Sequence, residues 1–92
     1  MDTFSQLIVK IIQEQETIMG PIAIEQAQKI NGLVINWKDH SVIISGDKKN
    51  ILENLVNKYQ SIFGQTSVEV CREIVHSMES NIPENIIPKL LH

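Results

Sequence analysis

The side chains that most often do chemistry are few in this chain and far apart. No two of the three histidines (His40, His76 and His92) have the i, i+3 or i+4 spacing with which one helix presents a pair of metal ligands. Cys71 is the only cysteine, which excludes an intramolecular disulfide and a cysteine-based zinc site. Cys71 and His76 would point about 140° apart on one helix, too far to form a thiol–imidazole pair. We predict no metal site, no cofactor and no catalytic residue.

One short polar segment still combines binding groups. Trp37, Lys38 and His40 bring the only tryptophan close in sequence to a cation and an imidazole. This combination favours a small-ligand-binding or enzymatic site near that turn. We keep it as the alternative function.

Two further motifs resemble known sites only in outline. Residues 45–49 pass from a predicted strand into a helix, where backbone N–H groups can hold a phosphate. They lack the glycine pattern of a phosphate loop, and Asp47 as an N-cap would repel an anion. The helices on either side of Gly64 resemble a helix-turn-helix, the third alternative. The acidic residues Glu73 and Glu79 oppose contact with phosphates, so we expect no nucleic-acid partner.

Composition narrows the class of protein. The chain has 92 residues, a net charge of −3 and 42% hydrophobic residues, enough for one domain with a modest core. No basic segment suits a nucleic-acid backbone, and no apolar run approaches the ~20 residues of a membrane span. The N-terminus lacks the pattern of a signal peptide, so we expect a cytoplasmic protein without a membrane partner.

The first third of the chain has helical periodicity. Apolar residues recur with helical spacing from Phe4 to about Glu16, after Asp2 or Thr3 as N-cap. Gly20–Pro21 interrupts this pattern, and a second helix should start at Pro21 and end near Asn31–Gly32. A single kinked helix is the competing interpretation. The predicted buried stripe of the second helix is Ile22, Ala23, Ala27 and Ile30.

The strongest strand signal lies between residues 33 and 45. Two β-branched runs, 33–37 and 41–45, flank a three-residue polar break of hairpin length. Alternation places Leu33, Ile35 and Trp37 on one face, and Val34 and Ile43 on the opposite one.

Two more helices and an apolar tail complete the pattern. Asp47 should cap a helix that ends at Gly64, with Ile51, Leu52, Leu55, Val56, Tyr59, Ile62 and Phe63 inward. Thr66 and Glu69 have capping-box spacing and should open a fourth helix, with Val68, Cys71, Ile74, Val75 and Met78 inward. Two prolines break the tail, where a helical turn can form between residues 83 and 87.

These elements predict an α+β fold in the order α-α-β-β-α-α, with one antiparallel β-hairpin covered by helices. Residues 1–80 form one compact domain and 81–92 a C-terminal tail. Two strands alone are marginal, and one face of the hairpin is left without a cover. We expect a non-enzymatic interaction or regulatory module that forms a homodimer. Its predicted contact surface is Val34, Ile43, Ile86, Ile87, Leu90 and Leu91.

Overall fold

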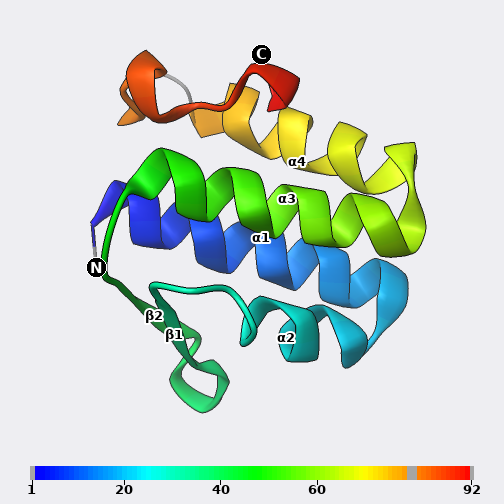
Figure 1. The fold of residues 1–92 in the computed structure, drawn as a ribbon. Helices are drawn as coiled ribbons and strands as arrows, with labels where there is room; N and C mark the ends of the chain where they lie inside the picture. The colour runs from blue at the N-terminus through cyan, green and yellow to red at the C-terminus, as the bar shows by residue number, and fades with distance from the viewer. Residues whose placement is uncertain (1, 79–80, 92) are drawn as a thin grey trace.

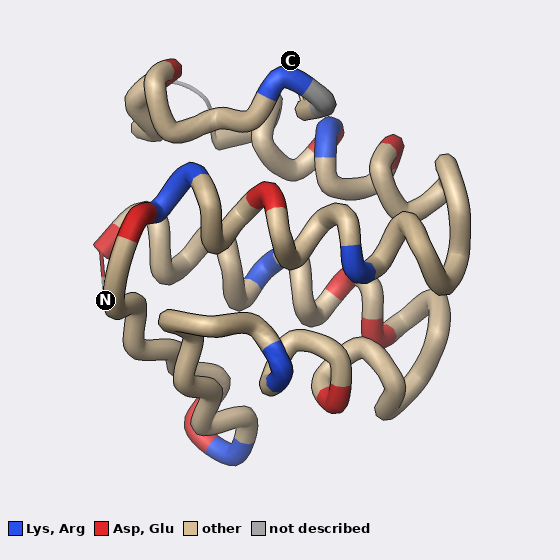
Figure 2. The backbone as a smooth tube through the Cα atoms, viewed as in Figure 1, with Lys and Arg blue, Asp and Glu red and all other residues tan. Residues whose placement is uncertain are grey.

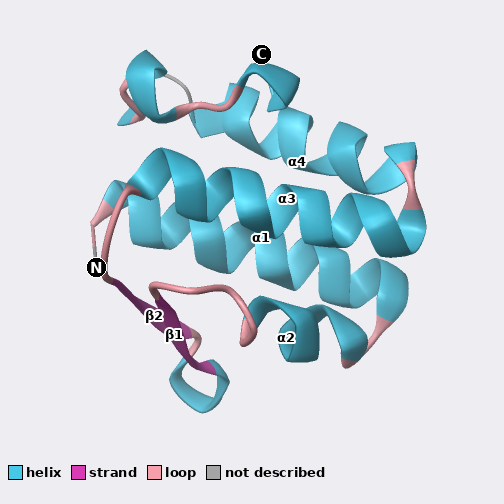
Figure 3. Cartoon of the chain, in the orientation of Figure 1, coloured by secondary structure: helices cyan, strands magenta, loops and turns pink. Residues whose placement is uncertain are grey.

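The computed structural model describes residues 2–78 and 81–91. In this part of the chain, four helices and one two-stranded antiparallel sheet follow the predicted order, which confirms the small α+β fold (Figure 1, Figure 3). The elements are α1 (Thr3–Met19), α2 (Ile22–Ala27), β1 (Leu33–Asn36), β2 (Ser41–Ile44), α3 (Lys48–Phe63) and α4 (Gln65–Met78), with 3-10 turns η1 (Trp37–Asp39), η3 (Glu84–Ile86) and η4 (Lys89–Leu91).

Helix α1 lies at the centre of the fold. Asp2 caps it, because its side chain accepts a 2.7 Å hydrogen bond from the Ser5 N–H. The helix contacts α2, α3, α4 and β2, with α3 in front of it in Figure 1. Four apolar side chains of α1 are completely buried: Leu7, Ile8, Ile11 and Ile12. The core is therefore built around α1 rather than around the sheet.

The break at Gly20–Pro21 separates two helices that pack against each other, so the single kinked helix is not formed. Gly20 has a φ of +71°, which favours glycine. Helix α2 ends at Ala27, earlier than predicted, yet Ile30 is still buried in the turn that follows. The prediction that Ile22 is buried was wrong: it is the first residue of α2 and is exposed.

The hairpin has the predicted alternation and shorter strands. β1 ends at Asn36, because Trp37 enters the 3-10 turn η1 instead of continuing the strand. The turn closes where His40 adopts a left-handed conformation with a φ of +50°. Leu33 and Val42 are buried, while Ile35 and Ile44 are half-buried against the same core.

Helices α3 and α4 form a hairpin on α1. Asp47 caps α3 as predicted, accepting a 3.0 Å hydrogen bond from the Asn50 N–H. α4 starts directly after Gly64, so Thr66 lies inside the helix and the predicted capping box is not formed. The prediction that Ile62 and Phe63 are buried was wrong: both are exposed in the last turn of α3, where the chain turns at Gly64 into α4.

The tail packs on the domain. Ile82, Ile87 and Leu91 are buried, with η4 against α4, and η3 supplies the helical turn expected between residues 83 and 87. His92, Glu79 and the side chain of Leu90 lie outside the described residues.

The turn before β1 lies very close to the end of β2, and a substitution at Gly32 tests this contact. Gly32 has a φ of +85°, and a Cβ there would overlap the carbonyl oxygen of Ser45. Gly20→Ala should lower the free energy of unfolding by about 1–3 kcal/mol through backbone strain alone. Gly32→Ala should cost about 1–3 kcal/mol more, because the overlap adds to the strain. Urea unfolding followed by circular dichroism measures both, and equal costs would contradict the close approach.

Candidate functional site

The outer face of the hairpin carries an exposed apolar pair. Val34 and Ile43 are direct partners in the strand register, and their side chains are 60% and 67% exposed. Asn36 and Ser41 form the polar pair next along this face. Antiparallel sheets with one wet face usually place polar residues there, so two β-branched apolar side chains at one position stand out.

The edges of the hairpin are also unpaired. Within residues 2–78 and 81–91, the sheet contains only β1 and β2. An antiparallel ladder directs half of each strand's N–H and C=O groups away from its partner. The exposed pair therefore lies between two edges to which another strand could add.

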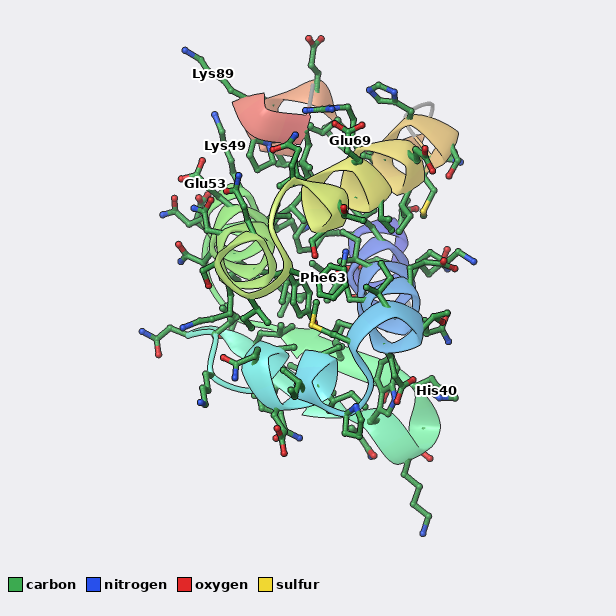
Figure 4. The ribbon with its side chains drawn as sticks, turned by 90° about the vertical axis from the view of Figure 1, so that its right-hand side faces the viewer. His40, Lys49, Glu53, Phe63, Glu69 and Lys89 are labelled. Carbon is green, nitrogen blue, oxygen red and sulfur yellow. The ribbon has the colours of Figure 1, made fainter. Side chains whose placement is uncertain are left out.

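The residues predicted for a ligand site lie together at the tip of the hairpin. The rings of Trp37 and His40 meet edge to face, with centroids 4.8 Å apart. Asn36 Nδ2 donates a 2.8 Å hydrogen bond to Asp39 Oδ2, while Lys38 is exposed. Figure 4 shows His40 on the opposite side of the molecule from Lys49 and Glu53 of α3. These contacts explain the turn itself, and ligand binding there stays a prediction.

The tail residues are placed differently from the hairpin pair. Ile87 and Leu91 are buried against the domain and Ile86 is half-buried. In the folded chain, Ile87 and Leu91 therefore cover the core and offer no contact surface. Of the predicted interaction residues, only Val34 and Ile43 are found exposed among those whose side chains are described.

Three further exposed apolar side chains were not predicted from the sequence. Ile22, Ile62 and Phe63 are exposed, and Figure 4 shows Phe63 at the end of the helices that faces the viewer. The position of Ile62 and Phe63 in the sequence was the signal that could have indicated their exposure. Ile62 and Phe63 directly precede Gly64, where the chain leaves α3 and covering neighbours run out.

A polar hollow of about 380 Å³ lies between the α2–β1 connection and α3. It is lined by Lys29, Ile30, Asn31, Asn54, Asn57, Lys58 and Ser61. The lining residues on α3 follow helical spacing, so the α3 side of the hollow could be predicted from the sequence. Two of them are asparagines, each of which costs up to about 0.7 kcal/mol of helix stability relative to alanine.

Tyr59, the neighbour of Lys58 along α3, links α3 to α2. Its side chain is completely buried, and its hydroxyl donates a 2.7 Å hydrogen bond to the carbonyl oxygen of Ala23 in α2. Burial raises the pKa of the Tyr59 phenol, so the group remains a neutral donor at physiological pH. The hydrogen bond joins α3 to α2 beside Lys58.

Cys71 belongs to a buried polar cluster between α1 and α4. Gln15 Nε2 donates to the Ser67 carbonyl oxygen at 3.1 Å and to Cys71 Sγ at 3.4 Å. Burial raises the pKa of the Cys71 thiol to about 12, against a smaller opposite effect of the Gln15 hydrogen bond. Cys71 is therefore a neutral thiol, while His76 is exposed. This cluster does not supply a nucleophile.

Charges are spread thinly over the described chain. Figure 2 shows basic and acidic positions interspersed along the backbone. Within residues 2–78 and 81–91, no three His, Cys, Asp or Glu side chains group in a way that could hold a metal ion. Over the same residues, no helix has the length and hydropathy needed to cross a membrane.

The burial of Cys71 predicts that the fold weakens at alkaline pH. The thiol titrates near pH 9.0 when exposed and near pH 12 in the native chain, so the native state holds its proton more tightly. The free energy of unfolding should fall above about pH 9, by up to about 1.4 kcal/mol per pH unit for this group. Urea unfolding between pH 7 and 11 tests this, and Cys71→Ala should make the slope shallower. An unchanged slope would contradict the assignment.

No protein-family model, curated protein or solved structure matches this chain. Its function has to be inferred from its own surface. Two features lack a structural explanation there: the apolar pair Val34–Ile43 on the hairpin, and the polar hollow beside α3.

Proposed function

We propose that this chain is a non-enzymatic interaction module that self-associates through the outer face of its hairpin. The observation that supports the proposal is the direct pairing of Val34 with Ile43, both more than half exposed. Exposure of these apolar side chains to water is unfavourable, so their burial against a second surface would stabilise the contact. The lone unpaired thiol of Cys71 suits a reducing compartment, so we place the module in the cytoplasm.

The charge of the hairpin is compatible with a second copy as the occupant. The chain as a whole carries −3, so two copies repel each other over most of their surfaces. Residues 33–46 contain one lysine and one aspartate, Lys38 and Asp39, and have no net charge. Two hairpins can therefore meet face to face or edge to edge without that repulsion. Such a contact would be two-fold symmetric, like most homodimer interfaces.

The size of the pair limits the strength of this contact. Complete burial of one such side chain stabilises by about 1.5–3 kcal/mol, and these two are about three-fifths exposed. Four side chains across a two-fold contact then contribute about 4–8 kcal/mol, against an association cost of at least about 4 kcal/mol. The most favourable balance is about −4 kcal/mol, so we expect a dissociation constant of about 1 mM, which describes a weak, concentration-dependent contact rather than an obligate dimer.

Sedimentation equilibrium over about 5 μM to 1 mM tests the proposal. The double variant Val34→Thr/Ile43→Thr keeps β-branched side chains, so the hairpin should persist while the outer face becomes polar. We expect it to weaken self-association at least about tenfold. Ile62→Gln is the matched control, because it removes an exposed apolar side chain on α3 and should leave association unchanged.

Two results would overturn the proposal. One is a strict monomer at 1 mM for the unmodified chain. The other is an equal loss of association in Ile62→Gln and in the hairpin variant. Circular dichroism of each variant verifies that the fold is retained, so that a change in mass reports on the contact.

A further inference from the structure

We propose that the polar hollow between the α2–β1 connection and α3 binds a small phosphate-bearing molecule. Lys29 and Lys58 bring two positive charges to it from two different elements. None of its seven lining residues is acidic, although the chain has eleven acidic residues against eight basic ones. The hollow is thus a locally positive site in an acidic protein, which favours an anion.

The two lysines have no counter-ion within the described part of the chain. The ion pairs found there are Lys10 with Glu14 at 3.4 Å and Arg72 with Glu69 at 3.2 Å. Along the chain, the acids nearest to the hollow residues are Glu25 on α2 and Glu53 on α3. Neither lines the hollow. Neither lysine would have to leave a bound carboxylate to contact an anion placed there.

The other polar groups of the hollow are short neutral side chains. Asn54, Asn57 and Ser61 share one face of α3 with Lys58, at i, i+3, i+4 and i+7. The amides of Asn54 and Asn57 have no hydrogen-bond partner among the described residues and can donate to a ligand oxygen. Asparagine is a poor helix former, so its repeated use on this face brings the helix no local benefit. The Ser61 hydroxyl already donates a 2.7 Å hydrogen bond to the Lys58 carbonyl oxygen, so the donors left for a ligand are the amides and the ammonium groups, which match the oxygens of a phosphate group.

Both walls are held in place before any ligand arrives. The Tyr59 hydroxyl ties α3 to the Ala23 carbonyl at 2.7 Å. Backbone hydrogen bonds from Lys29 N–H to Gln26 O and from Ile30 N–H to Ala27 O, both 3.1 Å, fix the opposite wall. The buried Ile30 side chain anchors that wall in the core. A volume of about 380 Å³ is in the range of small-molecule sites and exceeds what a bare ion needs.

An NMR titration of the full chain tests this site. ¹H–¹⁵N spectra at low ionic strength would be followed with inorganic phosphate and with glycerol 3-phosphate, and chloride and glycerol would serve as controls. We expect saturable shifts confined to the amides of residues 29–31 and 54–61. The dissociation constant should be lower for glycerol 3-phosphate than for inorganic phosphate, because the larger ligand fills more of the hollow.

Charge-matched variants separate a site from general attraction. Lys58→Gln should weaken phosphate binding at least about fivefold, whereas Lys49→Gln removes the same charge from the same helix outside the hollow and should have little effect. Linear shifts that do not saturate, or equal losses in both variants, would overturn the proposal. Malonate binding as tightly as glycerol 3-phosphate would overturn the choice of phosphate in favour of a carboxylate ligand. Val34→Thr/Ile43→Thr should bind phosphate normally, so this test stands apart from self-association.

Discussion

The burial of α1 is the constraint on which the rest of this structure depends. A chain of 92 residues can bury only one small core, and here that core surrounds a single helix. Leu7, Ile8, Ile11 and Ile12 are completely buried, and the apolar faces of α2, α3, α4 and β2 are directed toward them. Each neighbouring element thus satisfies its own apolar face by covering α1.

This arrangement leaves the hairpin with only one covered face. β2 packs on α1, and every other long helix is already engaged with α1 or with its neighbours. The outer face, with Val34 and Ile43, has no element left to cover it. In a larger domain a further layer would fill that place.

Buried polar groups define how the helices pack. The Tyr59 hydroxyl needs an acceptor once it is buried, and the Ala23 carbonyl provides it across the α2–α3 contact. Gln15 makes the corresponding links from α1 to α4 through the Ser67 carbonyl and Cys71. A shift in helix register would break such hydrogen bonds inside the core. A purely apolar contact would tolerate the same shift better. The Tyr59 bond also anchors α3, which forms one wall of the hollow, to α2.

The sequence alone determined the elements whose signals act over a few residues. Periodicity located the helices, Asp2 and Asp47 identified two N-caps, and strand alternation identified Val34 and Ile43 as the outer face. These features were predictable because capping and side-chain alternation depend on near neighbours along the chain.

Tertiary structure decided which apolar residues at the ends of elements are covered and which polar residues meet. Phe63 continues a buried stripe but is exposed, whereas Leu91 of the tail is buried. Lys29 and Lys58 line the same hollow because the segments that carry them pack together. The hydrogen bond between Ala23 and Tyr59, which are 36 residues apart in the sequence, is part of that packing. Such outcomes depend on where distant segments pack and where their partners end, which no local pattern encodes.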